Sequence, residues 1–226
     1  MGERKYSEVY DYFLVDEATP HDSSIYADGI LITPCDIGQG VRSNDRVGNQ
    51  IIVSSFQAKL VISPWNDHTG QDETCQNATQ PDFMLRIIVF TWFGEIQPTL
   101  GDIIETDEHF GSPYWNVLSP LNGYKKCKRK VWYDETSTHY ATGEINDFNG
   151  VATAVYNPLC VRDIYIPIDK YNKVYYTGPS FDPVDDGGIT NGLYMFLISN
   201  ILPFGANGQR RPWPVYIYYR LNYKDF

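Results

Sequence analysis

The sequence predicts an all-β protein, an eight-stranded antiparallel jelly roll in which two sheets pack as a sandwich, with one short helix near residues 99–105. Segments of alternating apolar and polar residues follow one another along the chain, separated by loops rich in Gly, Pro, Asp and Asn. Aromatic residues make up 15% of the 226 residues, and such side chains suit pleated, half-buried strands. The pattern predicts eight or nine strands. Because eight strands with long loops can close as two sheets, and no linker divides the chain, we expect one domain over residues 1–226.

The individual elements follow from periodicity. The clearest alternation covers residues 48–62, and it predicts a core-facing set of Ile52, Phe56, Ala58, Leu60 and Ile62. Residues 83–93 are apolar on both faces, which predicts a central strand whose second face is covered by another part of the chain. Thr99 is a candidate N-cap for the short helix. Further strands are expected over residues 6–15, 29–33, 127–137, 162–168, 173–177, 193–198 and 215–223.

Charge and cysteine usage exclude several classes of protein. The formal net charge of −10 argues against a domain that binds nucleic acid or an acidic membrane with its whole surface. No signal peptide and no apolar stretch of membrane-spanning length is present, so we expect a soluble protein with no membrane partner. No CxxC spacing joins the cysteines, and free thiols are expected at Cys35, Cys75, Cys127 and Cys160.

The chain carries no recognisable catalytic motif. Its histidines are isolated, and no GxSxG, Walker or GxGxxG motif occurs, so we expect no enzyme, no catalytic residues and no bound cofactor. The isolated histidines also give no support for a metal site; they are His21, His68, His109 and His139. Two acidic loops, residues 67–73 and 182–186, offer oxygen ligands that suit calcium between subunits; the alternative is that both are solvated.

One basic cluster stands out in this acidic chain. It runs directly into Val131, Trp132 and Tyr133, and positive charge beside aromatic rings is typical of sites for single-stranded nucleic acid. The alternative is a solvated strand edge, where lysines discourage pairing with another strand. The cluster consists of Lys125, Lys126, Lys128, Arg129 and Lys130.

The order of segments resembles the jelly-roll capsid proteins of circular single-stranded DNA viruses, which are circovirus-like, and the coats of satellite tobacco necrosis virus-like particles. The residues that carry the resemblance are Arg46–Ile51 before a long strand, the apolar strand Leu85–Trp92, Pro98–Leu100 followed by Ile103 and Ile104, a basic strand ending in Asp134, and Arg220–Tyr223.

The resemblance implies a viral coat protein that assembles with itself into a 60-subunit icosahedral T=1 shell around a small single-stranded circular DNA genome. Such a protein would be found in the virion, and in the nucleus or cytoplasm of the host cell during assembly, and would meet a host receptor that the sequence does not identify. Coats of this family begin with an arginine-rich arm. Only Arg4 and Lys5 are basic here, so we expect a truncated or absent arm, with these two residues as its remaining contacts to nucleic acid.

A shell also needs contacts between subunits. Large aromatic side chains left over after the core is filled are the candidates: Phe90, Trp92, Trp115, Trp213, Tyr216 and Tyr218. Two alternative functions stay open. One is a monomeric carbohydrate- or receptor-binding β-sandwich module, which would share the aromatic and acidic composition. The other is a glycosidase on a jelly-roll scaffold, which would need two carboxylates facing each other across a cleft.

Overall fold

The predicted all-β sandwich of two antiparallel sheets is confirmed by the computed structural model. Sheet A contains β1, β12, β3, β8, β9 and β10, and sheet B contains β2, β11, β4 and β5. The structure describes residues 3–15, 29–42, 45–62, 83–94, 96–105, 113–139, 145–146, 152–153, 160–168, 172–177, 188–200 and 213–225.

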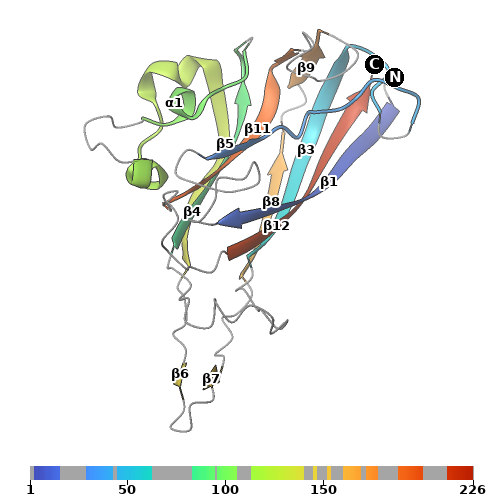
Figure 1. The fold of residues 1–226 in the computed structure, drawn as a ribbon. Helices are drawn as coiled ribbons and strands as arrows, with labels where there is room; N and C mark the ends of the chain where they lie inside the picture. Colours follow the sequence, from blue (N-terminus) through green and yellow to red (C-terminus); the bar gives the residue numbers. More distant parts are fainter. Residues whose placement is uncertain are drawn as a thin grey trace.

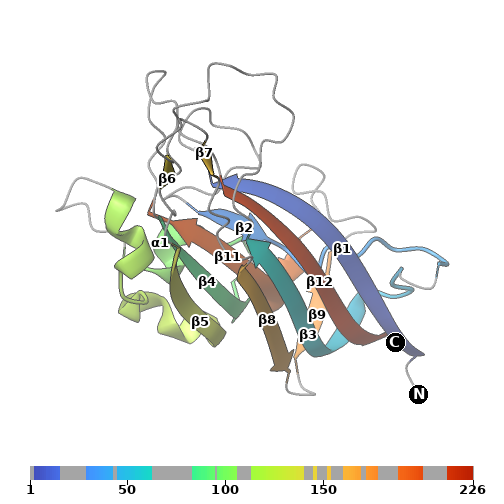
Figure 2. The ribbon, with the colours of Figure 1, turned by 90° about the horizontal axis from the view of Figure 1, so that it is seen from below.

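Sheet A holds both ends of the described chain. β12 lies between β1 and β3, and the other edge of β3 pairs with β8 along one half and with β9 along the other half. Figure 2 shows β1, β12 and β3 side by side. The strands are β1 (Glu3–Val15), β12 (Trp213–Asp225), β3 (Gln50–Ile62), β8 (Cys160–Pro167), β9 (Lys173–Tyr176) and β10 (Ile189–Thr190).

Sheet B is the second layer of the sandwich, and β11 and β4 form its middle (Figure 1). Its strands in order are β2 (Ile30–Ile32), β11 (Gly192–Ser199), β4 (Phe83–Trp92) and β5 (Arg129–His139). A separate two-stranded pair, β6 (Ile145–Asn146) and β7 (Ala152–Thr153), lies away from both sheets.

Most strands pair symmetrically about the middle of the chain, as in a long antiparallel hairpin that is folded over. When β6, β7, β9 and β10 are left aside, eight described strands remain, four in each sheet. The first of these pairs with the last, the second with the seventh, the third with the sixth and the fourth with the fifth. These pairs are β1 with β12, β2 with β11, β3 with β8 and β4 with β5, and all are antiparallel. Along the first half of the chain, successive strands alternate between the two sheets.

The main core lies between the inner faces of the two sheets. Side chains from β3, β12 and β8 in sheet A meet those from β4 and β11 in sheet B. The predicted alternation of β3 is confirmed over most of its length, since its buried residues include Phe56, Ala58, Leu60 and Ile62.

A β-bulge corrects the prediction at the start of β3. Ile52 was expected in the core, but it is only half-buried, while Ile51 and Val53 are fully buried. The register of β3 against β12 shifts at this point, so Ser54 has no opposite residue on β12. One extra residue reverses which side chains of a strand point inward, and an alternation read from sequence cannot locate it.

A second core covers the outer face of sheet B, as the two apolar faces of residues 83–93 predicted. Short helices pack over this face, namely α1 (Leu100–Ile103) and the 3-10 helix η3 (Pro113–Leu118). The buried residues of this second core are Ile88, Phe90, Trp92, Ile103, Ile104, Val117, Tyr194, Phe196 and Ile198.

The short helix predicted near residues 99–105 is confirmed as α1, with Thr99 as its N-cap. The carboxylate of Asp102 accepts hydrogen bonds from the backbone N–H of Thr99 at 3.0 Å and from its hydroxyl at 2.9 Å. These bonds hold the first turn and fix the angle at which the chain crosses sheet B.

Arg46 anchors the loop before β3. Its side chain is fully buried, and the guanidinium donates to the backbone oxygens of Ile37 at 3.0 Å and Gly48 at 2.6 Å. The guanidinium carbon lies 4.1 Å from the ring centroid of Tyr176. Burial without partners would be costly for a charge, so these contacts are what hold the loop against the sandwich.

The second core gives a matched test of stability. We expect Phe90→Ala to lower the free energy of unfolding by about 3–5 kcal/mol, because Phe90 is fully buried and its removal leaves a cavity. Phe93→Ala is the control, since Phe93 is 44% exposed and should cost less than about 1 kcal/mol. Urea unfolding followed by tryptophan fluorescence measures both. Equal losses for the two variants would contradict the second core.

Candidate nucleic-acid interface and assembly surfaces

The basic cluster begins as a helical turn, although the sequence predicted a strand from residue 127. Residues 123–128 form the 3-10 helix η4 (Gly123–Lys128), and β5 begins at Arg129. The side-chain oxygen of Asn122 accepts a hydrogen bond from the backbone N–H of Tyr124 at 2.9 Å, which caps the turn. The first lysines of the cluster therefore lie on a turn at the end of sheet B.

The lysines of the cluster differ in how available they are. Lys126, Lys128 and Lys130 are exposed. Lys125 lies 3.7 Å from the carboxylate of Asp102. Burial alone would raise the pKa of Asp102, but hydrogen bonds from Thr99 and the Lys125 ammonium hold it below its usual value. Lys125 therefore serves in part to hold α1.

Arg129 is not available to nucleic acid, contrary to the prediction. It is buried, and its guanidinium donates to the backbone oxygens of Asn122 at 2.7 Å and Asp102 at 3.2 Å. Burial lowers the pKa of Arg129 from its ordinary value. Arg129 satisfies carbonyls at the end of α1 and before η4, which a linear count of charges cannot reveal.

The aromatic residues after the cluster are also largely committed. The Lys130 ammonium lies 3.8 Å from the ring centroid of Trp132, and the indole N–H of Trp132 donates to the Thr91 hydroxyl at 2.9 Å. Tyr133 is half-buried and its hydroxyl donates to Glu135. The ring most available beside the lysines is that of Tyr124, which is 93% exposed and was missed by sequence reasoning.

The two N-terminal basic residues point in opposite directions. Arg4 is exposed, whereas Lys5 is buried and lies 3.3 Å from the carboxylate of Asp225. The Lys5 ammonium also donates to the backbone oxygen of Asp45 at 2.9 Å. Lys5 as a nucleic-acid contact is therefore wrong, because alternation along β1 turns it toward the core, where it joins the first strand to the last.

Two of the predicted subunit contacts are also wrong. Phe90 and Trp92 lie in the second core beneath α1 and η3, and the indole N–H of Trp92 donates to the backbone oxygen of Ile96 at 2.8 Å. The apolar face that the sequence left over is covered within the subunit. The side chains of Trp115 and Trp213 lie outside the described part of the chain.

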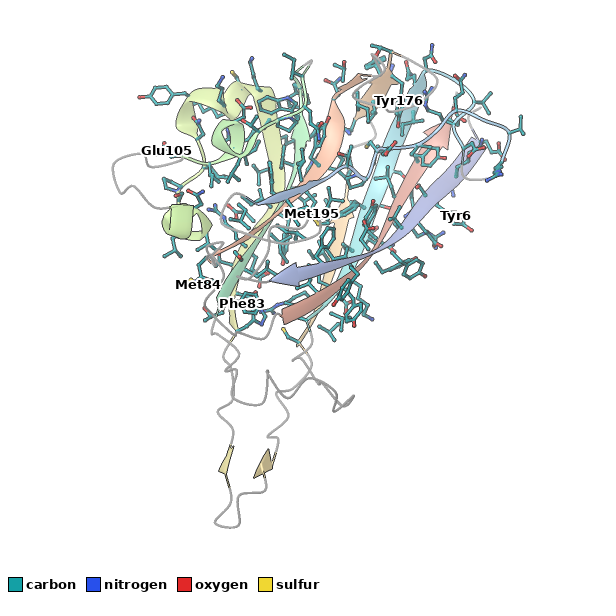
Figure 3. The ribbon with its side chains drawn as sticks, in the orientation of Figure 1. Tyr6, Phe83, Met84, Glu105, Tyr176 and Met195 are labelled. Atoms are coloured by element: carbon teal, nitrogen blue, oxygen red, sulfur yellow. The ribbon has the colours of Figure 1, made fainter. Side chains whose placement is uncertain are left out.

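Tyr216 and Tyr218 belong to a tyrosine-rich outer face of sheet A. Tyr216 is exposed, Tyr218 is half-buried, and each lies opposite a tyrosine of β1. The ring centroids are 5.1 Å apart for Tyr12 and Tyr216 and 4.7 Å apart for Tyr10 and Tyr218. Figure 3 labels Tyr6, a third tyrosine of the same strand. Sequence periodicity located Tyr216 and Tyr218 but not their partners on β1.

Two groups of exposed apolar side chains lie at different places on the sandwich. The first group, named the β4-end patch, consists of Phe93 and Ile96, which follow β4, and of Tyr124 in η4; the backbone N–H of Phe93 donates to the backbone oxygen of Lys128 at the end of η4. The second group, the loop patch, consists of Val41 and Val47, and the backbone N–H of Val47 donates to the carboxylate of Asp225 near the chain termini. In Figure 1, α1 and the chain termini lie on opposite sides of the molecule.

Catalytic and metal-binding groups are sparse in the described residues. No group of three or more His, Cys, Asp or Glu side chains that could hold a metal ion occurs among them. Both acidic loops proposed for calcium, and His21, His68 and His109, lie outside those residues. Cys35 is buried, and burial raises the pKa of its thiol to about 12. Nor does any described helix have the length and apolar character to cross a membrane.

His139, on β5, is the one histidine of the described residues. It is buried, its ring stacks on Phe83 with centroids 4.7 Å apart, and its Nε2 lies 2.9 Å from the Ser137 hydroxyl. Burial, together with the charge of Arg162, lowers the pKa of His139 to about 4. This histidine is neutral at neutral pH and belongs to the packing of sheet B.

Comparisons with known proteins give no family for the chain. A scan against protein-family models found no match, and a search of curated proteins found none either.

The buried histidine predicts a pH dependence of stability. The pKa of His139 is near 6.5 when unfolded and about 4 when folded, so the unfolded state binds more protons between these values. Stability is therefore full above pH 6.5 and falls as the pH is lowered toward 4. We expect a loss of about 2 kcal/mol from this group between pH 7 and pH 5.

His139→Gln tests the assignment, because glutamine keeps a polar side chain that does not titrate. Urea midpoints of the parent and the variant are compared at pH 7 and pH 5. The stability difference between the two proteins should shrink at pH 5. An unchanged difference would show that His139 does not cause the acid loss.

Proposed function

We propose that this chain is the coat protein of a small virus and assembles with itself into an icosahedral T=1 shell around a single-stranded DNA genome. The observation that carries the proposal is the strand order, in which each of eight strands pairs with its mirror partner along the chain. We infer that this sandwich is a jelly roll, an architecture that viral capsids share with lectins and other proteins. One fold serves many functions, so the choice among them depends on the exposed surfaces.

The two apolar patches favour assembly. Rings of subunits around an axis need heterologous contacts, in which one patch of a subunit meets a different patch of its neighbour. The β4-end patch follows β4 of sheet B, the loop patch precedes β3 of sheet A, and both are exposed, with Ile96 82% exposed. Contiguous exposed apolar patches are typical of contact sites, and we propose that each group forms one. They replace Phe90 and Trp92 as the candidate contacts.

Net charge sets the conditions under which a shell would close. Subunits of net charge −10 repel one another at low ionic strength, and salt screens that repulsion. Apolar contacts are not weakened by moderate salt. Assembly is therefore expected to increase as the salt concentration rises.

Light scattering with negative-stain microscopy tests the proposal. The purified protein is titrated with sodium chloride, once alone and once with circular single-stranded DNA. We expect uniform hollow spheres of megadalton mass at moderate salt in at least one series. A species near the 25.9 kDa monomer mass under every condition would contradict a coat protein and favour the monomeric binding module.

A matched pair of variants tests where the subunits meet. Ile96→Asp places a charge in the β4-end patch and should abolish or strongly reduce particle formation, because a desolvated charge opposes the contact. Thr138→Asp adds the same charge at an exposed position of β5 and should leave assembly intact. Circular dichroism checks that both variants are folded. Equal assembly of the two variants would exclude the β4-end patch as a contact.

A further inference from the structure

We propose that the outer face of sheet A binds single-stranded nucleic acid, with bases stacked on its tyrosines and phosphates held by its cations. The inference rests on the proposed function, because it assigns to one surface of the coat protein the contact with its genome. This surface, the tyrosine face, is formed by the outward side chains of β1, β12, β3 and β8 and of β9, which continues the sheet. The described helices α1 and η3 pack on sheet B and leave this face open.

Tyrosines dominate the face. Alternation along each strand places them opposite the core, and Tyr10 and Tyr165 are 76% and 64% exposed. Aromatic rings on an open sheet are the usual platform for unpaired bases, and stacking accepts any base. The tyrosines of the face are Tyr6, Tyr10, Tyr12, Tyr165, Tyr175, Tyr216 and Tyr218.

The rings form rows across the sheet. Tyr12 lies opposite Tyr216, and Tyr10 lies opposite Tyr218 in the next row. Neighbouring rows on one face of a strand are two residues apart, which is about 6.6 Å, since each residue advances about 3.3 Å. That spacing is about twice the 3.4 Å between stacked bases, so the rows match every second base of a stacked strand.

The face is cationic in an acidic protein. Three of its cations, Arg4, Lys173 and Lys224, make no ion pair within the described part of the chain, and they lie together where β1, β12, β3 and β9 meet in register. The face carries Arg4, Lys59, Lys173, Arg220 and Lys224 against Glu8 and Asp163. The whole chain has a net charge of −10, so this positive excess separates the face from the rest of the molecule.

The paired charges of the face support its rings. The guanidinium of Arg220 lies 3.4 Å from the Glu8 carboxylate and 4.1 Å from the ring centroid of Tyr6. The hydroxyl of Tyr218 donates to the same carboxylate at 2.8 Å. These contacts hold the outer rings in fixed positions before any ligand arrives, which reduces the entropy lost on binding.

A depression lies in the middle of the face. Its volume is about 380 Å³, which lies within the usual range for small-ligand pockets. Tyr165 and Tyr218 line it, together with the amide of Gln57 and the charged pair of Lys59 and Asp163, which are 3.6 Å apart. Rings and hydrogen-bonding groups in one depression suit an unstacked base with its polar edge.

The basic cluster of residues 125–130 has fewer cations and aromatic rings available for nucleic acid. Arg129 is buried, Lys125 is paired with Asp102, and one well-exposed ring, Tyr124, lies beside the remaining lysines. Single-stranded binding requires both a track of charge and successive rings. The tyrosine face provides both over five strands.

Fluorescence anisotropy with a labelled oligo-dT probe tests the proposal at low ionic strength, where light scattering first establishes that the subunits are unassembled. Tyr10→Ala and Tyr165→Ala should each weaken binding about tenfold, because each removes one stacking ring. The double variant Lys173→Gln/Lys224→Gln should lower the slope of log affinity against log salt by about 0.7 for each phosphate that is no longer neutralised. The double variant Lys126→Gln/Lys128→Gln is the matched control and should bind like the parent.

A second measurement does not depend on the folding of any variant. An oligonucleotide containing 5-bromodeoxyuridine is cross-linked to the parent protein with ultraviolet light, and the adducts are located by mass spectrometry. Adducts on tyrosines of β1, β8 or β12 support the proposal. Adducts confined to Tyr124, or a loss of binding in the Lys126/Lys128 variant alone, would assign the contact to the basic cluster and overturn it.

The outcomes separate this inference from the proposed function. Particles that form without any binding of oligo-dT by the free subunit would overturn the nucleic-acid face and leave the coat protein standing. Binding of oligo-dT without assembly under any condition would support the nucleic-acid face and contradict the coat protein. If Tyr10→Ala abolishes association between subunits and leaves oligo-dT affinity unchanged, the face is a contact between copies and the inference is wrong.

Discussion

The position of β12 between β1 and β3 is the constraint on which the rest of the fold depends. Glu3 pairs with Asp225, so sheet A joins residues from the two ends of the described chain. Most contacts of this architecture join residues far apart in the sequence, and such contacts slow folding. They reduce stability little, because the entropic cost of closing a loop rises only slowly with its length. The buried pair of Lys5 and Asp225 lies where the ends meet, and Asp225 also accepts from the backbone N–H of Val47. Replacing either residue by a neutral one would remove an ion pair from a buried site, which is costly.

Sheet B, unlike sheet A, has a second apolar face, on its outer side. β4 and β11 are buried on both faces, and no strand pairing can cover the second face. α1 and η3 provide the cover, and Arg129 ties the end of α1 to the start of β5 through backbone oxygens. The consequence is that the most apolar strand of the chain contributes its aromatic side chains to stability within one subunit. In the proposed shell, contacts between subunits would come from loops and strand ends.

Periodicity in the sequence was sufficient for the fold class, for α1 and for the covered strand, because each of these depends on local pattern. It failed where one tertiary contact decides the outcome. The extra residue Ser54 reverses the facing of Ile51 and Ile52. Lys5 is buried beside the carboxylate of Asp225, and Arg129 is buried because it donates to the backbone oxygen of Asp102; both partners are remote in the sequence. Within the candidate surfaces, the sequence located Tyr216 but not Tyr124, because the exposure of a loop ring depends on the turn that carries it.

The contrast between Arg4 and Lys5 shows why net charge is a poor guide to what such a chain can bind. Two adjacent cations on one strand point to opposite sides of the sheet, so one is neutralised in the core and the other adds to the outer face. Successive side chains of a strand point to opposite faces of the sheet, so charged residues are divided between the two faces. A sheet with one solvent-exposed face can therefore concentrate cations and aromatic rings there, while acidic residues lie in loops. A nucleic acid meets the local field within about a Debye length and not the total charge. An acidic chain of this architecture can therefore carry a cationic, aromatic surface without any cluster of basic residues in its sequence.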